Sequence, residues 1–310
     1  MVESNKIIAV VGPTASGKTA LGVAIAQRLG NAEVVSCDSV QIYSGIEIAT
    51  AKPSVEEMCG VPHHLIGYVN PRVNYTAADW ARDAAKKLTE IEAEGKTAVI
   101  VGGTGFYLRT LRQPLFESPP TDPEIRARLL TLKDEKGSEA LHAMLCDIDP
   151  EAAKKISARD FIRTTRALEV FFQTGLRISE QQPKRGAPSE LSGRISLVVL
   201  DPSREDLYTR INIRTQKHFE NGLVDEVRQL LQQGVPESSN ALGAHGYRRV
   251  CEHLRGERSL EETVSKTQQD VRNYAKRQRT WFKSEHPSEW FHGFGESQEI
   301  QGEVFRNLEI

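Results

Sequence analysis

Short apolar runs alternate along the first part of the chain with stretches in which apolar residues recur every three or four positions. Residues 6–11, "KIIAVV", form a β-branched run typical of a buried parallel strand, and residues 19–29 predict a helix. A second strand is predicted to end at Asp38, an amphipathic helix to cover residues 79–94, and a third strand to open into the turn of "KTAVIVGGTG". This alternation predicts an α/β fold with a parallel, doubly wound sheet flanked by helices.

The sheet pattern is interrupted between residues 113 and 193. This stretch opens with the Pro-rich "QPLFESPPTDPE", in which Thr121 or Asp122 is placed to cap a helix, and it closes with "QQPKRGAPSELSG". Helical segments lie between the two, and the fourth strand is predicted only at residues 194–201. We therefore expect a helical domain over 113–193, inserted into an α/β domain of residues 1–112 and 194–310 and free to swing on its linkers.

The C-terminal part is predicted to be helical almost throughout. Helices are expected over residues 206–220, 223–233, 246–254 and 260–284. The residues after "EWFHGF" are rich in Glu and Gln, and no element is predicted for them.

Composition narrows the class of protein. The chain has 310 residues with 39% hydrophobic residues, which is ordinary for a soluble globular protein, and its start is too short for a signal peptide or a membrane span. The four cysteines lie far apart without a C-x-x-C pair, so neither a zinc site nor a disulfide framework is predicted. We expect a cytoplasmic protein with no membrane association. Because no self-complementary apolar stripe stands out, we also expect a monomer.

Charge is unevenly distributed, although the net charge is only −2. Residues 154–177 carry six basic and two acidic side chains, and residues 266–283 carry six basic and one acidic. A near-neutral chain with two basic stretches is typical of a protein that contacts a phosphate backbone on one face. Two solvated helix faces would give the same pattern, so that alternative stays open at this point.

The first strand and helix enclose the pattern G-x-x-x-x-G-K-[ST]. In such a loop, glycines bring backbone N–H groups close to an anion at a helix N-terminus, a lysine adds a cation and a hydroxyl binds phosphate-bound Mg²⁺. An ATP-like ligand would fit this motif as well as a diphosphate. The predicted phosphate-binding residues are Gly12, Pro13, Thr14, Ala15, Ser16, Gly17, Lys18 and Thr19, with Thr19 as the metal ligand.

Two further polar residues follow predicted strands. Asp38 comes just after the second strand and Thr104 just after the third, so both are expected at the edge of the sheet that holds the phosphate loop. Asp38 has a structural alternative, because aspartates at strand ends often cap the turn that follows.

Several segments together resemble the tRNA dimethylallyltransferases. They are "GPTASGKT", "SCDSVQIYSGIEIATAKP", "PHHLI", "VGGTGFYL", "GYR" and "KRQRTWF", and the resemblance covers about Ile7 to Phe282. It implies a P-loop NTPase-like sheet with an inserted helical domain. It also implies transfer of a dimethylallyl group from dimethylallyl diphosphate to N6 of an adenine on the 3′ side of the anticodon in tRNA, with release of diphosphate. Adenylate isopentenyltransferases share the first segments and remain an alternative.

The resemblance also assigns roles to residues. Asp38 is expected to accept a proton from N6, Lys18 and Thr19 with Mg²⁺ to bind the diphosphate, and Arg214 to lie near it, unless Arg214 is a surface arginine. Contacts with the tRNA anticodon stem-loop are implied for Asp38, Ser39, Val40, Gln41, Thr104, Arg126, Ile162, Arg163, Thr164, Thr165, Arg166, Gly243, Ala244, His245, Gly246, Tyr247 and Arg248.

Helical spacing adds detail to these contacts. Arg159, Arg163 and Arg166 are spaced to share one helix face. Ala244 and His245 depart from the family pattern, in which a Cys-Val or similar small apolar pair is expected. In the last basic stretch, Lys276, Arg277 and Arg279 are expected to be available to phosphates, whereas Trp281 and Phe282 are expected in the core.

Two other function classes fit parts of the chain. A small-molecule kinase would use Asp201 after "SLVVLD" to bind Mg²⁺ and the insertion as a lid over ATP, although the helix-start signal "PSRED" explains Asp201 without a metal. A nucleotide-dependent RNA-binding switch would need no chemistry. Release of diphosphate from a prenyl donor distinguishes the transferase from both.

Overall fold

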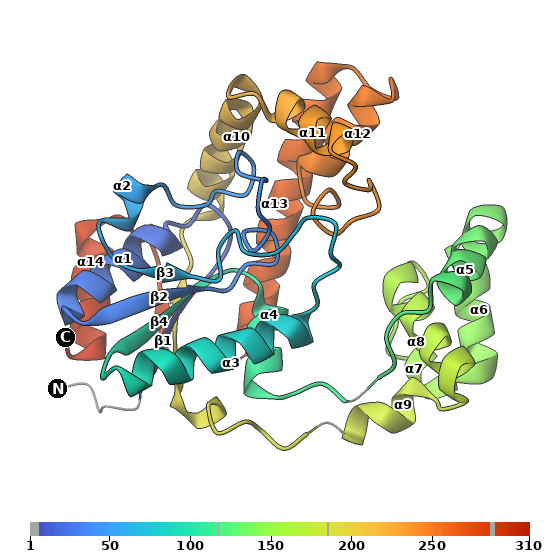
Figure 1. The fold of residues 1–310 in the computed structure, drawn as a ribbon, viewed down its shortest axis with the longest axis horizontal. Coiled ribbons are helices and arrows are strands. Elements are labelled where there is room, and N and C mark those ends of the chain that lie inside the picture. Colours follow the sequence, from blue (N-terminus) through green and yellow to red (C-terminus); the bar gives the residue numbers. More distant parts are fainter. Residues whose placement is uncertain (1–5, 117, 185, 286–288) are drawn as a thin grey trace. The chain divides into compact units, whose positions relative to one another are not determined.

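The computed structural model describes residues 6–116, 118–184, 186–285 and 289–310 (Figure 1). The chain forms two compact units: a sheet unit, Met1–Arg112 with Glu190–Ile310, and a helical unit, Gln113–Ser189. The predicted return to the sheet unit at residue 194 is therefore four residues late. Leu191 already packs against the core of the sheet unit, which places the segment before the fourth predicted strand with that unit.

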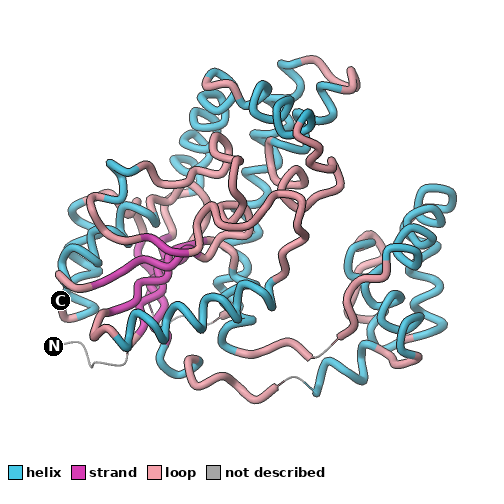
Figure 2. The backbone as a smooth tube through the Cα atoms, viewed as in Figure 1, coloured by secondary structure: helices cyan, strands magenta, loops and turns pink. Residues whose placement is uncertain are grey.

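The sheet has six parallel strands in the order β3-β2-β4-β1-β5-β6. Figure 2 draws the strands in magenta among the helices and loops. The four predicted strands are present, although the second ends two residues before Asp38. The two edge strands β3 and β6 were not predicted, because two or three residues are too few to show a period. The strands are β1 Ile7–Val11, β2 Ala32–Ser36, β3 His63–His64, β4 Thr97–Gly102, β5 Ile195–Leu200 and β6 Glu289–Phe291.

Alternate residues of the central strand β1 enter two different cores. Ile7, Ala9 and Val11 belong to the larger core, and Ile8 and Val10 to the smaller one on the opposite face. Helix α1, Lys18–Leu29, and helix α14, Gln298–Leu308, pack on the smaller core, whereas α3, Ala77–Ala93, and α4, Gly105–Arg112, pack on the larger. Figure 1 shows these layers. A strand covered on both faces explains why β1 reads as a continuous apolar run.

The C-terminal helices complete the sheet unit. Their N-termini carry strong signals: Ser203 accepts a hydrogen bond from the Asp206 amide, and Ser259 forms a capping box with Glu262. Helix α14 lies where no element was predicted, and its Ile300 and Val304 are buried in the smaller core. The remaining elements of the unit are α2 Val55–Met58, the 3₁₀ turn Ser192–Arg194, α10 Arg204–Glu220, α11 Leu223–Gln232, α12 Tyr247–Leu254 and α13 Leu260–Ser284.

The helical unit has its own core of leucines and alanines, including Leu141, Leu145 and Leu168. Of the two predicted caps, Asp122 begins the first helix by accepting hydrogen bonds from the amides of Glu124 and Ile125. No described helix in either unit is long and apolar enough to cross a membrane. The unit consists of α5 Pro123–Lys136, α6 Ser138–Ile148, α7 Pro150–Ala153, α8 Phe161–Thr174, α9 Ile178–Gln181 and the 3₁₀ turn Gln182–Lys184.

Candidate active site

The loop between β1 and α1 has the geometry of an anion cradle. Gly17, at the N-cap of α1, has φ 84°, and a Cβ atom there would lie 2.7 Å from the Gly295 amide nitrogen, so only glycine fits. No side chain caps α1, which leaves its first N–H groups for an anion. The Ser16 hydroxyl is also buried without a hydrogen-bond partner among the described residues. The loop thus offers several unsatisfied donors at one point.

Two cations stand at this loop. Lys18 Nζ donates a hydrogen bond to the Pro13 carbonyl at 2.6 Å, and Arg214 on α10 donates to Thr14 Oγ1 at 2.6 Å. Burial lowers the pKa of Lys18 to about 7 and that of Arg214 to about 10, and the Arg214 charge adds to the lowering at Lys18. Two partly desolvated cations favour an anion as their partner. Arg214 is therefore part of the loop's surroundings rather than a remote surface arginine.

Asp38 lies within electrostatic reach of both cations. Its charge raises the pKa of Lys18 and of Arg214, opposing the effect of burial. Asp38 Oδ1 accepts hydrogen bonds from the amides of Val40 at 2.8 Å and Gln41 at 3.2 Å, so the turn cap considered as an alternative is present. Its Oδ2 makes no hydrogen bond to another described residue. One carboxylate oxygen fixes the turn, and the second remains for chemistry.

Thr104 connects Asp38 to the glycine turn and to α13. Its hydroxyl accepts a hydrogen bond from the Ser39 amide at 3.1 Å, and its own amide donates to the Cys37 carbonyl at 3.2 Å. The hydroxyl of Tyr274 interacts with the Thr104 side chain, while burial and the Asp38 charge raise the pKa of that phenol. The sheet edge therefore gathers the phosphate loop, Asp38 and Thr104, as the topology predicted.

Gln278 of α13 is a site residue that sequence reasoning missed. Its Oε1 accepts a hydrogen bond from the Thr14 amide at 2.7 Å, and its Nε2 donates to the Gly103 carbonyl at 2.9 Å. A Cβ atom on Gly103 would lie 2.1 Å from Gln278 Nε2, which explains a glycine in this turn. Gln278 thus joins the phosphate loop to the turn that carries Thr104. The signal that could have identified it is a polar residue between Ala275 and Phe282 on the buried face of an amphipathic helix.

The loop after Asp38 is held by its own side chains. Gln41 Nε2 donates to the carbonyls of Thr50 at 3.2 Å and Ala51 at 2.9 Å, and Val40 packs against the larger core. Both side chains are partly exposed, and their contacts with tRNA stay predictions.

Tyr247 also has a structural role. It is fully buried, donates a hydrogen bond to Glu226 Oε1 at 2.5 Å and accepts one from the Ala49 amide at 3.3 Å. The predicted tRNA contact of its side chain is therefore wrong for this conformation, and the neighbouring Gly246 is buried as well. In the same segment Gly243 and Arg248 are exposed, and Ala244 and His245 are partly exposed.

In the helical unit, α8 divides the predicted contacts into exposed and buried residues. Ile162 is 68% exposed and Arg163 is exposed, whereas Thr164 and Thr165 are buried inside the unit. Because buried hydroxyls do not reach an RNA, the predicted tRNA contacts of these two threonines are corrected. Arg159 precedes α8 and does not share the expected helix face.

Two of the predicted RNA-contacting arginines help to hold the helical unit together. Arg126 and Arg166 both pair with the carboxylate of Glu169, which is fully buried. Arg166 also donates to Ser118 Oγ at 2.7 Å and to the Pro119 carbonyl at 2.8 Å. Among the described residues, Arg163 pairs with the Asp160 side chain alone, at 2.6 Å on the surface. Of the three, Arg163 has the cation that an RNA phosphate reaches with least rearrangement.

Asp201 is occupied in a way that does not fit the kinase alternative. Its Oδ2 accepts a hydrogen bond from Arg279 Nη2 at 2.9 Å, and its Oδ1 pairs with Arg279 Nε at 2.5 Å. The prediction that Arg279 is free for phosphates is therefore wrong. Phe282 is buried, and Trp281 packs against the larger core with the Arg109 guanidinium 4.0 Å from its ring centroid. The expectation that Trp281 and Phe282 belong to the core is confirmed.

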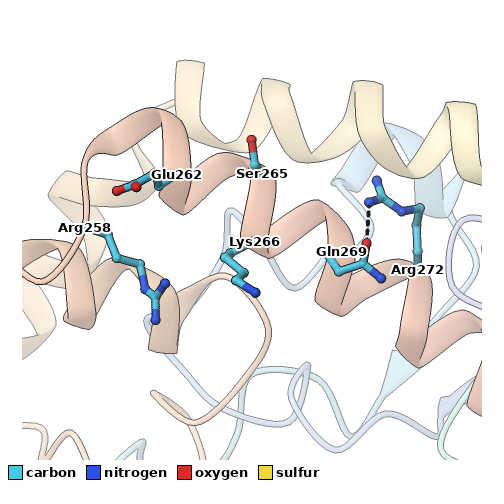
Figure 3. A pocket seen from close by; sticks show the side chains of 6 residues that line it. All are labelled: Arg258, Glu262, Ser265, Lys266, Gln269 and Arg272. Carbon is cyan, nitrogen blue, oxygen red and sulfur yellow. Dashed lines mark hydrogen bonds between the residues drawn. The ribbon is translucent and has the colours of Figure 1, made fainter.

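A groove of about 440 Å³ follows the N-terminal half of α13 (Figure 3). Arg258 at one end pairs with Glu252 at 2.7 Å, and Arg272 at the other donates to Gln269 Oε1 at 2.9 Å. Lys266 between them makes no ion pair or hydrogen bond with any described residue. Within the second basic stretch, Lys266 and Arg272 thus keep charges that no acidic side chain at this groove neutralises. The groove is lined by Arg258, Glu262, Ser265, Lys266, Gln269 and Arg272.

The residues at the phosphate loop fit a Mg²⁺ ion that is carried by a diphosphate. Thr19 lies in the first turn of α1, and its hydroxyl makes no hydrogen bond to the described part of the chain. The described residues contain no group of three or more His, Cys, Asp or Glu that would hold a metal by themselves. Mg²⁺ keeps several waters and commonly binds through one or two protein ligands together with substrate phosphates. A single free hydroxyl beside the anion cradle matches that requirement.

Comparison with known proteins identifies relatives over nearly the whole chain. Residues 41–285 match the family model described as IPP transferase. The chain is 44% identical over 288 residues to a tRNA dimethylallyltransferase of Geobacter metallireducens, with 93% of each chain covered. It is also 44% identical over 277 residues to one of Myxococcus xanthus, with 89% of each covered.

Solved structures of related transferases also match nearly the whole chain. The full-length tRNA isopentenylpyrophosphate transferase of Bacillus halodurans is 36% identical, with a TM-score of 0.70, covering 98% of this chain and 97% of that one. A eukaryotic dimethylallyltransferase described as acting on tRNA has a TM-score of 0.78 at 24% identity, covering 98% of this chain and 78% of that one, which shows a shared fold. The predicted P-loop NTPase-like α/β fold is confirmed.

Proposed function

The chain belongs to the IPP transferase family, and on that premise we propose that it transfers a dimethylallyl group from dimethylallyl diphosphate to tRNA. The acceptor is N6 of an adenine on the 3′ side of the anticodon, and diphosphate is released. One observation carries the proposal: a diphosphate cradle with two cations, Lys18 and Arg214, lies at the same sheet edge as the carboxylate of Asp38. Lys18 and Arg214 suit an anionic leaving group, and the Asp38 carboxylate suits the removal of a proton from the nucleophile.

The phosphate loop assists the reaction by stabilising the leaving group. As the bond between the allylic carbon and oxygen breaks, negative charge builds on the diphosphate, where Lys18, Arg214 and the N–H groups of α1 are aimed. Mg²⁺ bound through Thr19 and the diphosphate oxygens would neutralise part of that charge. The phosphate loop therefore holds a product rather than a phosphate to be transferred.

The nucleophile needs help because the lone pair on the adenine amino group is delocalised into the ring. Asp38 Oδ2 accepts one N6 hydrogen, orients the amine and takes its proton as the new nitrogen–carbon bond forms. The electron pair of the broken carbon–oxygen bond leaves with diphosphate. Two amides hold Oδ1 in place, so the carboxylate stays oriented throughout. Asp38 is thus a catalytic residue in this proposal, and Gln278 is a positioning residue for the loop opposite it.

Lys18 makes donor capture dependent on pH. Its pKa of about 7 in the donor-free protein means that the ammonium form is lost as pH rises through neutrality. The kcat/KM for dimethylallyl diphosphate, which reports ionisations of the free enzyme, should fall about tenfold per pH unit above ~7. Lys18→Arg should remove this fall, because a guanidinium keeps its charge. A flat profile from pH 7 to pH 9 in the unaltered protein would contradict the assignment of Lys18 as the diphosphate cation.

Arg163 tests the RNA-binding role of the helical unit. Arg163→Ala should weaken tRNA binding and reduce the slope of log K against log salt by about one unit, because one phosphate contact is lost. Donor affinity should not change. Arg128→Ala removes another exposed arginine of the same unit. As the control, it should leave tRNA binding and its salt slope unchanged. Equal salt slopes for Arg163→Ala and the unaltered protein would assign Arg163 to solvated surface.

We also propose that the protein acts as a cytoplasmic monomer with tRNA as its only macromolecular partner. All the residues proposed here to bind the donor and to accept the proton lie in the sheet unit of one chain, which supports a site built without a second copy. Light scattering of the purified chain with and without tRNA tests this directly: the mass should be that of one chain, and one chain with one tRNA.

The proposed reaction is tested by measuring diphosphate release with each acceptor in turn. Release from dimethylallyl diphosphate and Mg²⁺ should require unmodified tRNA and should be absent with AMP, ADP or ATP. Release with an adenine nucleotide alone would instead favour an adenylate isopentenyltransferase. Phosphate transfer from ATP without use of the prenyl donor would favour the kinase. EDTA should abolish release if Mg²⁺ is needed, as Thr19 and the diphosphate imply.

A further inference from the structure

Two aromatic side chains meet beside the acceptor end of the site. His245 lies in the turn before α12 and Tyr274 lies on α13, with ring centroids 5.0 Å apart and ring planes inclined by 50°. The Arg277 guanidinium carbon lies 5.6 Å from the Tyr274 ring centroid. Two rings and an exposed cation in one place are the groups that single-stranded nucleic acids use for stacking and for phosphate contact.

The position of this pair relative to Asp38 is fixed by Thr104. The Tyr274 hydroxyl interacts with the Thr104 side chain, and Thr104 Oγ1 accepts the hydrogen bond of the Ser39 amide. The pair therefore lies on the side of the sheet edge at which an adenine N6 would meet Asp38. The phosphate loop lies on the other side, where Gln278 contacts Thr14 one turn further along α13.

The described part of the chain gives the His245 ring no hydrogen-bonding partner. Neither of its nitrogens bonds to another described residue, whereas the His253 ring nearby bonds to the Arg258 carbonyl at 2.9 Å. Burial and the Arg277 charge lower the pKa of His245, so the imidazole is neutral near pH 7. A polar ring held half-buried beside a site without an internal partner is available to a ligand.

This histidine also departs from the pattern on which the family resemblance rests, where a small apolar residue is expected. A valine at this position would offer Tyr274 no second ring. The departure therefore adds aromatic surface beside Tyr274, rather than altering the donor site.

We propose that His245 and Tyr274 form a stacking surface for the nucleobase next to the target adenine in the anticodon loop, with Arg277 contacting the adjoining phosphate. The inference rests on the proposed function. To expose N6 the enzyme has to unstack the target adenine, and its neighbour then loses a stacking partner. Aromatic side chains replace that partner with little dependence on base identity. His245 would then tune acceptor binding in this chain without touching the donor.

The test uses the full chain and an anticodon stem-loop RNA with 2-aminopurine beside the target adenine. Stacking on the His245–Tyr274 pair should quench the fluorescence of the probe on binding. His245→Val should remove the quench and weaken RNA binding about tenfold, which is at the lower end of the range for loss of one base–aromatic stack. His245→Phe, which keeps a ring, should restore both. His253→Val, which changes a histidine with an internal partner on the neighbouring helix, should leave both unchanged in a folded protein.

The outcomes separate this inference from the function on which it rests. If the unaltered protein transfers the prenyl group and binds the RNA, but His245→Val binds and quenches equally well, the stacking surface is refuted and the function stands. If His245→Val weakens binding and His245→Phe does not restore it, stacking is likewise refuted. If the unaltered protein neither binds the RNA nor modifies tRNA, the proposed function fails and the inference fails with it. Thermal unfolding of each variant shows that these losses are not losses of folding.

Discussion

Asp38→Asn should lower kcat by ~10²- to 10⁴-fold, the range expected when a general base is removed. The substitution keeps the size of the side chain and one carbonyl oxygen, which is enough to accept the hydrogen bonds from the amides of Val40 and Gln41. The turn should therefore survive. What is lost is the basicity of the second oxygen, which has no other partner among the described residues. Single-turnover prenyl transfer at saturating tRNA and donor measures the effect.

Asp38→Asn has one side effect that the experiment has to avoid. The Asp38 charge raises the pKa of Lys18, so its removal leaves the ammonium easier to deprotonate. The two proteins are therefore compared over a pH series, which separates the loss of the Lys18 charge in the variant from the loss of the base. Asp122→Asn is a matched control, because Asp122 Oδ1 accepts the same pair of amide contacts at the N-cap of α5, in the other unit. Rates within a few fold for both variants would show that Asp38 is a turn cap and nothing more.

Lys18→Ala should reduce turnover by on the order of a hundredfold or more, the loss expected for one preorganised donor to a developing negative charge. The loop should keep its shape, because Gln278 still accepts from the Thr14 amide and Gly295 still donates to the Ser16 carbonyl. Affinity for tRNA should be nearly unchanged, since Lys18 faces the diphosphate. Rapid-quench measurement of prenyl transfer with saturating donor separates the chemical step from binding.

Lys217→Ala provides the charge-matched control for Lys18→Ala. Lys217 lies on α10 within a turn of Arg214, but its side chain is exposed. Its loss should leave both donor affinity and turnover unchanged. Normal turnover of Lys18→Ala at saturating donor would mean that the loop binds diphosphate without assisting its departure.

The parts of the fold and site that sequence could predict are those determined by local pattern. β1 and the phosphate loop lie within a few consecutive residues, so β-branched periodicity and one motif define them. Asp38 and Thr104 could be brought together by topology alone, since parallel strands end at the same edge. In contrast, Gln278 is separated from Thr14 by 264 residues, and no local period encodes that contact.

A motif match also does not say which way a side chain points. Tyr247, Thr164 and Thr165 match positions expected to contact tRNA, yet all three are buried. For the two threonines, the helical period of α8 indicates burial. They share α8 with Ala167, Leu168 and Val170, which line the core of the helical unit, whereas Ile162 and Arg163 lie on the opposite, exposed side. Burial periodicity within α8 separates the residues that support the unit from those that face solvent.

Mass analysis of tRNA tests the central claim most directly. Unmodified tRNA is incubated with the protein, Mg²⁺ and dimethylallyl diphosphate, then digested to nucleosides. The account predicts one adenosine per acceptor tRNA, on the 3′ side of the anticodon, heavier by one dimethylallyl group in place of one hydrogen, with an equal amount of diphosphate released. Unchanged tRNA, in the presence of a folded protein that binds both substrates, would contradict it.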